Sequence, residues 1–426
     1  MNWIPGFERC LLIVAAAALA GCETQVSDPL APADPLVYQL DYTVAADPAN
    51  GSVAVTMQVR QPRSLLRELR FSTDDRVSDI SADGKLTFDG PNATWRLPER
   101  GGSISWQVSV PHRRNGDGYD AWLGPDFGLF RAEDIIPRVS SRTVKGARSE
   151  TSLTFRLPPG WSVVSQYFDD AGRFRIDNPE RRLDLPSGWL VLGELGVRRE
   201  RIAGVRVAVA GPVGHSVRRL DTLALLNWTL PELARILPQL PPRLTIVSAG
   251  DPMWRGGLSA PLSFYVHADR PLISENATST LLHEIMHMSL RFDAAEGYDW
   301  IVEGLAEYYS LQLLRRSGTI TADRYAQAVS DLASWSEQAD TLCKPSSSGS
   351  TTALAVGIFD ALDAEIQETT DGNAGLDDVA ALLWQFNGKV DAATLREMTA
   401  ALTGVKPDAL HSDRLPGCRS ISGDPA

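Results

Sequence analysis

Two short stretches of the chain carry side chains that could bind a metal ion and activate water. The first contains His283, Glu284 and His287 in the pattern His-Glu-x-x-His. On a helix the two histidines lie one turn apart on the same face, where two imidazoles can bind a single Zn²⁺ ion. Glu284 can then reach a water molecule on that ion as a general base. A catalytic zinc site takes three protein ligands and keeps one position open, so a third ligand must come from another part of the chain.

The second stretch lies in another apolar run and supplies two carboxylates at helical spacing. Glu303 is the expected third ligand, and Glu307 is expected to orient a ligand imidazole through a hydrogen bond. The alternative is a chance pattern, because His-Glu-x-x-His also occurs in helices that bind no metal. The neighbouring residues are mostly apolar, so these charges would be costly to bury without a cation or a hydrogen-bonded histidine. Only six histidines occur in the chain, and two stand here at metal spacing. The pattern therefore favours a metal site.

The two motifs together resemble those of the gluzincin metallopeptidases. The second motif reads Trp-x-x-Glu-Gly-x-Ala-x-Tyr from Trp300 to Tyr308. Within the gluzincins it is most similar to the glycyl aminopeptidase family and the thermolysin-like zinc aminopeptidases, over residues 245–385. The resemblance implies one Zn²⁺ ion held by His283, His287 and Glu303. It also implies the role of base for Glu284 and a supporting role for Glu307.

Three departures from the family pattern concern the spacing and the substrate. The gap between His287 and Glu303 is a few residues shorter than the aminopeptidases usually show. Family members carry a Gly-x-x-Glu strand whose glutamate holds the free amine of the substrate, and this chain has Ser259 in that place. The family's transition-state tyrosine has no counterpart in the run from Leu354 to Gly357. Zinc binding is therefore better supported by the sequence than aminopeptidase activity.

Residues that would hold the substrate are less clearly marked than the metal ligands. Gly256, Gly257 and Leu258 are expected at the edge of a small sheet, where a peptide can lie close and add itself as a strand. Three polar residues could stabilise the oxyanion in place of the tyrosine, although ordinary packing explains each of them as well: His215, Tyr265 and His267.

Without the amine-binding glutamate, the substrate's amino group needs another partner if the chain is an aminopeptidase. Glu296 or Asp299 could take this role, but no pattern in the sequence shows that either does. A restricted endopeptidase is equally compatible with the motifs. The polar loop from Lys344 to Thr352 precedes the place of the missing tyrosine, and it could be a lid or a region of divergence.

The elements that position these residues predict an α+β chain of several domains. Residues 37–200 contain short alternating runs separated by turn residues, which is typical of a β-sandwich-like domain. Residues 201–335 combine buried strands with helices, as expected of a thermolysin-like zinc domain. Its zinc helix is expected to be capped by Ser274 or Asn276. Residues 336–426 are predicted to be a helical C-terminal region.

The N-terminus predicts export and lipid attachment. Residues 1–22 have a short first region that ends with Arg9, followed by an apolar run too brief to span a bilayer, and they end in Leu-Ala-Gly before Cys22, which resembles a bacterial lipobox. The alternatives are an ordinary secretory signal or an uncleaved anchor. Lipidation at Cys22 followed by Glu23, rather than aspartate, favours the outer membrane, facing the periplasm. Residues 23–36 contain three prolines and are expected to be an extended tether.

Four cysteines occur in the chain, and two of them belong to the leader. Cys10 would leave with the signal and Cys22 would carry lipid. Cys343 and Cys418 are then the only pair in the mature protein, and in an oxidising periplasm they are expected to form a disulfide. No third thiol or histidine stands near them at ligand spacing, so a second metal site is not expected.

Composition limits the classes of partner. With 426 residues, of which 43% are hydrophobic and 22% charged, the chain is typical of a soluble globular protein. A net charge of −12 argues against nucleic acid and anionic lipid surfaces as partners. The expected partners are a peptide or protein substrate and, through Cys22, the membrane, while the oligomeric state is not indicated.

The sequence thus predicts a membrane-anchored zinc metallopeptidase of the bacterial cell envelope. A rival reading is an inactive lipoprotein in which zinc is structural and the β region binds a partner or acts as a scaffold. The presence of Glu284 argues against the rival, because a structural zinc site has no use for a base there.

Overall fold

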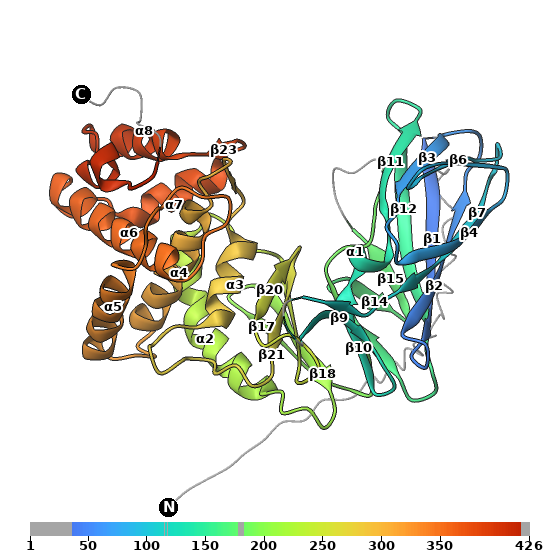
Figure 1. The fold of residues 1–426 in the computed structure, drawn as a ribbon, viewed down its shortest axis with the longest axis horizontal. Helices are drawn as coiled ribbons and strands as arrows, with labels where there is room; N and C mark the ends of the chain where they lie inside the picture. The colour runs from blue at the N-terminus through green and yellow to red at the C-terminus, as the bar shows by residue number, and fades with distance from the viewer. Residues whose placement is uncertain (1–35, 115, 117, 178–182, 419–426) are drawn as a thin grey trace, which may run out of the picture. The chain divides into compact units, whose positions relative to one another are not determined.

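The computed structural model describes residues 36–114, 116, 118–177 and 183–418 (Figure 1). The expected signal segment, Cys22 and the tether up to residue 35 lie outside the described residues. All described residues belong to one compact unit that begins at Leu36. Among them, no helix combines the length and the apolar character needed to cross a bilayer.

The first half of the described chain is built from three β-sheets, as its alternating sequence predicts. In β2 (Ser52–Arg60), every second residue from Val53 to Val59 is buried. A seven-stranded sheet has the order β14-β15-β12-β1-β2-β7-β4. The bounds of these strands are Phe168–Asp170, Arg173–Ile176, Arg148–Arg156, Val37–Asp47, Ser52–Arg60, Gly101–Ser109 and Val77–Ala82.

Two smaller sheets complete this β region. A four-stranded sheet has the order β11-β3-β6-β5, with bounds Arg138–Thr143, Leu66–Ser72, Asn92–Arg96 and Lys85–Asp89. A five-stranded sheet has the order β13-β16-β10-β9-β8, with bounds Ser162–Val164, Trp189–Gly193, Phe127–Arg131, Tyr119–Leu123 and His112–Arg113. The short helix α1 spans Ala132–Ile135. Buried side chains of all three sheets form one hydrophobic core, which stabilises them as a single body.

A second five-stranded sheet carries the expected zinc helix. Its order is β17-β18-β19-β21-β20, with bounds Leu195–Ile202, Val205–Pro212, Arg243–Ala249, Ser263–His267 and Gly257–Ala260. Strands β18, β19 and β21 run parallel, and β20 pairs antiparallel to β21 at the edge of the sheet. The expected boundary at residue 200 falls inside β17, which pairs along its whole length with β18. This sheet therefore begins five residues earlier, at Leu195.

Helices dominate from residue 219 onward, and Figure 1 shows α4 to α8 in orange to red. Their bounds are Arg219–Ile236 (α2), Thr280–Ser289 (α3), Trp300–Arg316 (α4), Ala322–Ser336 (α5), Ser350–Thr369 (α6), Leu376–Gln385 (α7) and Ala392–Thr403 (α8). Two 3₁₀ turns follow at Asp408–Leu410 and Ser412–Arg414, and β22 (Asp293–Ala294) pairs with β23 (Lys389–Val390). The expected mixture of β-sheets with a helical C-terminal region is thus confirmed.

One continuous core runs from Ile202 to Leu415 and joins this sheet to the C-terminal helices. It includes residues of α3, α4 and α6, so residues 201–335 and 336–418 share their packing instead of burying two separate cores. Gly304 shows how tight this packing is, because a Cβ atom there would lie 2.5 Å from the Cβ of Ala355. Only glycine at this position lets α4 approach α6 so closely.

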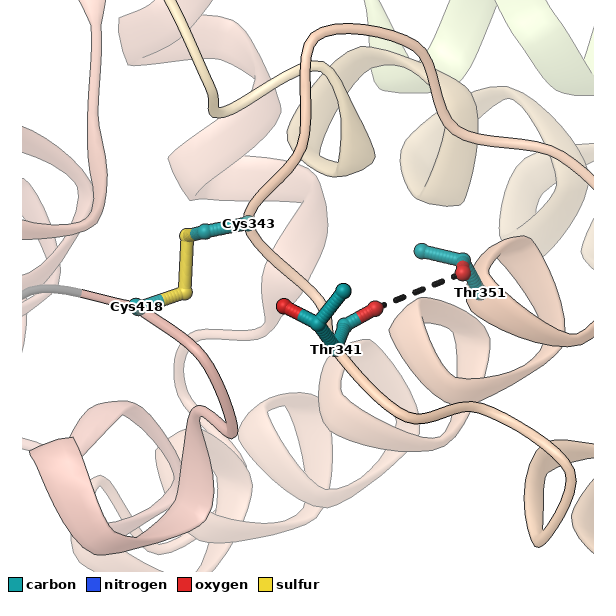
Figure 2. The surroundings of a disulfide bond; sticks show 4 residues. All are labelled: Thr341, Cys343, Thr351 and Cys418. Atoms are coloured by element: carbon teal, nitrogen blue, oxygen red, sulfur yellow. Dashed lines mark hydrogen bonds between the residues drawn. A yellow bond between two sulfur atoms is a disulfide. The ribbon is translucent and has the colours of Figure 1, made fainter.

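A disulfide joins Cys343 to Cys418, with the two Cα atoms 4.9 Å apart (Figure 2). It links the segment between α5 and α6 to the chain after α8. Beside it, the Thr351 hydroxyl donates a hydrogen bond to the carbonyl of Thr341 at 3.4 Å. The disulfide therefore connects the segment before α6 to the segment after α8, close to the start of α6.

Replacing both cysteines by serine should lower the free energy of unfolding. The bridge closes a separation of 75 residues, and by the chain-entropy model this contributes up to about 4 kcal/mol at 25 °C. Urea unfolding of the oxidised protein, the reduced protein and the Cys343→Ser/Cys418→Ser variant measures the difference. Reductant should destabilise the natural sequence and leave the double variant unchanged. Equal stability of all three would contradict a stabilising role.

Candidate metal centre

Helix α3 presents both expected histidine ligands on one face. His283 and His287 lie one turn apart, while Leu281, Leu282 and Ile285 point into the core. Each histidine side chain is about one-sixth exposed (17% and 15%). The helix therefore holds two imidazoles at the border between the core and solvent, where a metal ion can still be reached.

The start of this helix differs from the sequence-based expectation. Neither Ser274 nor Asn276 caps α3. The Ser274 hydroxyl instead bonds the hydroxyl and the backbone N–H of Thr278 at 2.8 and 3.0 Å, within a turn where Ala277 has a φ of 58°. The chain is not helical until Thr280, and Ser279 accepts the Leu282 N–H at 3.3 Å as the N-cap.

Helix α4 supplies the two carboxylates in the same one-turn spacing. Glu303 and Glu307 point toward α3, and the apolar residues Ile301 and Leu305 pack in the core that the two helices share. The Ser310 hydroxyl also donates to the carbonyl of Ser279 at 3.2 Å, which ties α4 to the start of α3. The register between the helices is therefore fixed by contacts on both sides of the ligand positions.

The three expected ligands converge on one point. The Nε2 atoms of His283 and His287 lie 2.9 Å apart, and each lies 3.3 Å from one oxygen of Glu303. Tetrahedral ligands at zinc–nitrogen distances lie about 3.3 Å from one another, so these separations fit a common centre. Among the described residues, this is the group of His, Cys, Asp and Glu side chains that could hold a metal ion.

Glu307 determines which nitrogen of His283 faces that centre. Its Oε2 lies 2.9 Å from Nδ1 of His283. A carboxylate only accepts hydrogen bonds, so Nδ1 carries a proton, and Nε2, which is directed at His287 and Glu303, is the nitrogen that offers its lone pair when it gives up its proton to a metal. The arrangement is the carboxylate–histidine pair that orients metal ligands in proteins, and two nearby imidazole nitrogens with a carboxylate fit zinc chemistry.

The charges of the metal-free site are strongly coupled. Burial alone would lower the pKa of His283, but the hydrogen bonds and charges of Glu303 and Glu307 raise it to about 10. Burial would raise the pKa of Glu303, and here His283 and His287 lower it to about 2. In the absence of metal, an imidazolium therefore takes the place of the cation between these carboxylates.

Glu284 lies on the side of α3 that faces strand β20. Its residue is only 8% exposed, and burial raises the pKa of its carboxyl, opposed by the nearby histidines and by a hydrogen bond from Ser259. A Cβ on Gly257 would lie 2.6 Å from the Cγ2 atom of Thr280 and 3.1 Å from the carboxylate of Glu284. Glycine is thus required there so that the strand and the helix can approach. Sequence reasoning identified Ser259 only as a substitution and missed this contact.

The other two residues expected to contact substrate have internal partners. A Cβ on Gly256 would overlap the ring of Trp254 at 2.0 Å, so this glycine accommodates an indole of the same chain. The side chain of Leu258 packs on a smaller core, and its carbonyl accepts the Nε1–H of Trp189 at 2.8 Å. The β20 edge is present as expected, but these glycines serve packing within the protein.

The three candidates for oxyanion stabilisation all have structural roles. The Tyr265 hydroxyl donates to the carbonyl of Trp254 at 2.7 Å, and its side chain lies in the core on the sheet face away from α3. His267 is 1% exposed and accepts the Asp269 N–H at 3.2 Å. Nδ1 of His215 accepts the N–H of Gly250 at 3.0 Å. The structure therefore brings none of them to the ligand cluster.

Three cavities border the site, and each is named here after an element or segment that lines it. The α5 cavity, of about 430 Å³, is lined by His283, Glu303 and Glu307 together with residues of α5 and the start of α6. The loop cavity, of about 580 Å³, is lined by His287, Ser259 and the segment 290–297. The sheet cavity, of about 760 Å³, extends from Ser259 to the four-stranded sheet.

The polar loop before α6 is fastened at the metal site. The backbone N–H of Ser347 donates to the carboxylate of Asp299 at 2.6 Å, so Asp299 is engaged in a structural bond. Ser348 and Gly349 line the α5 cavity, beside Trp335 of α5. No pattern in the sequence identified Trp335, or Asp331 one turn before it, as cavity residues.

Comparison with known proteins gives a structural likeness without a sequence match. No protein-family model matches the chain, and no curated protein does. An aminopeptidase N family protein from Idiomarina loihiensis superposes with a TM-score of 0.69 at 17% identity, covering 90% of this chain and 77% of that one. Native yeast LTA4 hydrolase superposes with a TM-score of 0.53 at 14% identity, covering 87% of this chain and 65% of the hydrolase. The yeast LTA4 hydrolase in complex with bestatin superposes with a TM-score of 0.54 at 14% identity, covering 90% of this chain and 69% of the hydrolase. The chain therefore has the multidomain fold of these proteins.

Zinc binding should release protons from the cluster. Because His283 is protonated in the metal-free protein up to a pKa of about 10, a zinc ion must displace a proton at neutral pH. We expect about one proton released per zinc, and an apparent affinity that rises roughly tenfold per pH unit between about pH 7 and pH 9. Calorimetry in two buffers of different ionisation enthalpy measures the number of protons released, and repeating it between pH 7 and pH 9 measures how the affinity for zinc changes. At pH 8 the Glu307→Gln variant should release fewer protons per zinc ion bound, because it lacks one of the carboxylates that keep His283 protonated. An affinity that is constant over this range would contradict the assignment.

Proposed function

We propose that the chain is a zinc-dependent peptidase in which Glu284 acts as general base. The observation that carries the proposal is the convergence of two Nε2 atoms and one carboxylate beside a second, buried carboxylate and an open cavity. Two histidines and a glutamate form a ligand set typical of catalytic zinc, in which a fourth position stays free. The shared fold of an aminopeptidase N family protein agrees with this.

The residues of this chain divide the work of hydrolysis between them. Zinc bound by His283, His287 and Glu303 would polarise a peptide carbonyl and make a water molecule more acidic. The carboxylate of Glu284 takes a proton from the attacking water, whose oxygen bonds to the carbonyl carbon. When the C–N bond breaks, Glu284 passes that proton to the leaving nitrogen.

The surroundings of Glu284 suit this exchange of protons. Burial raises the pKa of its carboxyl above its usual value, which makes the carboxylate a stronger base toward the attacking water. The hydrogen bond from Ser259 holds the carboxylate beside β20. Glu307 keeps His283 in the tautomer that leaves Nε2 free for the metal.

Glu284→Gln should abolish turnover and keep the metal. Glutamine has the same shape but cannot take a proton, so we expect kcat to fall by about 10²–10⁴-fold with unchanged zinc content. His283→Ala should lower both kcat and the zinc content, because it removes a metal ligand. Mass spectrometry of peptide products and metal analysis of the purified variants measure the two effects. If Glu284→Gln cleaved peptides at the natural rate, the assignment of the base would be wrong. If the natural chain cleaved nothing beyond this variant, an inactive binding or scaffold lipoprotein would be favoured.

The place of action is proposed from the N-terminal sequence. The residues Leu19, Ala20 and Gly21 before Cys22 support lipid attachment at Cys22 in the bacterial envelope, and Glu23 supports the outer membrane. The disulfide between Cys343 and Cys418 suits an oxidising compartment such as the periplasm.

Cys22→Ser should release the protein from the membrane fraction. Without the thiol no lipid can be attached, and several acyl chains are what makes such anchoring stable. Fractionation of cells that express each variant measures the effect, with Cys10→Ser as the matched control because Cys10 lies within the leader. Retention of Cys22→Ser at the membrane would favour an uncleaved anchor.

A further inference from the structure

Three arginines stand side by side across neighbouring strands of the sheet that carries the zinc helix. Arg201 of β17 is paired with Arg206 of β18, and Arg206 is paired in turn with Arg243 of β19. Residues that oppose each other directly in a sheet point to the same face. Arg199 lies two positions before Arg201 on β17 and therefore shares that face. Like charges placed directly opposite each other destabilise a sheet, so a negative charge close to them is favourable.

The face that carries these arginines packs against the first half of the chain. Ala210 stands four positions after Arg206 on β18, and it belongs to a small core that also contains Val164 of β13. Val164 in turn lines a cavity of about 560 Å³, which we name the arginine cavity. The arginine cavity is lined by residues 163–169 and 174 of the β region and by residues 199–201, 206–208, 243 and 245 of the sheet.

The arginines of this cavity have too few carboxylate partners. Asp177 accepts hydrogen bonds from both Nη atoms of Arg243, at 2.8 and 2.6 Å. Nη1 of Arg201 donates to a backbone carbonyl at 3.1 Å. Within the described part of the chain, the side chains of Arg199 and Arg206 have neither an ion pair nor a hydrogen bond. Three cations therefore face the cavity without a carboxylate bound to them.

Two acidic residues are found among the described residues that line the cavity, and one of them is turned away. The Glu200 side chain accepts the amide of Asn227 at 3.1 Å, and Asn227 belongs to α2, which packs on the opposite face of the sheet. The Asp169 carboxylate accepts the N–H of Gly172 at 2.7 Å, which is a neutral partner. Three arginines and one carboxylate leave an excess of two positive charges, in a chain whose net charge is −12. An anion with two negative charges would balance this excess.

Arg243 gives the cavity a buried cation that is held in one place. The residue is only 7% exposed, and its guanidinium carbon lies 5.5 Å from the centre of the Tyr167 ring. Its Nε atom is buried and has no hydrogen-bond acceptor among the described residues. A buried N–H without an acceptor is costly, so an oxygen atom of a ligand beside it would be favourable. This cavity is therefore more than a group of solvated side chains at the edge of a sheet.

The β region supplies an apolar wall. Phe168 of β14 lines the cavity and is 63% exposed, although large apolar side chains are usually buried. Val163 and Phe174 line the same wall. An apolar or aromatic group attached to the anion would cover Phe168 while the anion meets the arginines, which a simple inorganic ion cannot do.

We propose that the arginine cavity binds a phosphate monoester that carries an apolar or aromatic group. Such a phosphate has close to two negative charges at neutral pH, which matches the excess charge of the cavity. Guanidinium groups bind phosphate oxygens through paired hydrogen bonds. The ligand is either a soluble ester or the headgroup of a membrane lipid. The proposal does not depend on the peptidase function, because none of the three expected metal ligands lines this cavity.

Calorimetry with phenyl phosphate tests the choice of ligand. The protein from residue 23 onward, which retains the whole compact unit, is kept free of zinc so that the probe cannot bind a metal ion. We expect a Kd about tenfold lower than for benzoate, which has the same ring and one charge, and also lower than for inorganic phosphate. Phe168→Ala should remove the advantage over inorganic phosphate. Equal Kd values for phenyl phosphate and benzoate, or no binding at millimolar concentration, would overturn the proposal.

Glutamine variants show whether the probe binds at the arginine cavity. Arg201→Gln/Arg206→Gln should raise the Kd of phenyl phosphate about tenfold, because the double variant lacks two cations that have no carboxylate partner. Arg198→Gln is the matched control, since Arg198 is an exposed arginine of the same strand that points to the other face and does not line the cavity. An equal loss in this control would show that net charge alone attracts the probe, and the proposal would be wrong.

Thermal unfolding checks that the variants remain folded. In phosphate-free buffer of low ionic strength, Arg201→Gln/Arg206→Gln should have a Tm at least as high as the natural chain, because it removes repulsion between opposed arginines. Phenyl phosphate should raise the Tm of the natural chain and of Arg198→Gln, but not that of the double variant. A double variant that is destabilised without ligand would show that the arginines serve the fold, against the proposal.

Sedimentation with vesicles separates the two sources of the phosphate. Vesicles of phosphatidylcholine that contain phosphatidic acid are compared with vesicles of phosphatidylcholine alone, using the same soluble protein. Binding to the first kind only, displaced by phenyl phosphate and lost in Arg201→Gln/Arg206→Gln, would identify a lipid headgroup as the ligand. Binding of phenyl phosphate without any sedimentation would identify a soluble ester. Binding to neither probe would overturn the proposal.

Discussion

The packing of α3 against α4 is the constraint on which the site depends. Each helix contributes two groups one turn apart, and they meet only if the helices hold one register. Contacts among buried residues such as Ile285 and Leu305 set the distance between the axes, and the bond from Ser310 to Ser279 adds a polar tie near the start of α3. Gly304 lets α6 pack behind α4. Because interiors are close-packed, a shift of one helix would disturb the whole core before it separated the ligands.

This packing also forces opposite charges together at the border of the core. Glu303 and Glu307 lie beside His283, and the two carboxylates hold a proton on its imidazole without any metal. Buried charges are stable only when they are paired, and either a proton or a divalent ion can supply the positive charge between these carboxylates. The packing of the two helices brings these charges together, and it therefore makes a cation at this point favourable.

The parts of the site that are local in sequence were predictable, and the parts that depend on tertiary contacts were not. The helical spacing alone placed His283 with His287 and Glu303 with Glu307. The cap of α3 was not predictable, because Ser274 and Ser279 are both good N-cap residues and the choice depends on a turn in which Ser274 bonds Thr278. The boundary expected at residue 200 falls inside β17, because a strand pattern in the sequence does not show which sheet a strand joins. Each cavity is lined by segments that lie far apart in the chain, which no spacing in the sequence reveals.

Strand β20 contains one position that its packing fixes and, two residues later, one that contacts the proposed base. Gly257 must lie against α3 for any chain with this arrangement, because a side chain there would collide with Thr280. The position of Ser259 has no such constraint, so its side chain can change while the strand stays in place. A carboxylate at this position would point at Glu284, and two carboxylates would each raise the pKa of the other. With serine there, Glu284 gains a neutral hydrogen-bond donor instead of a second negative charge.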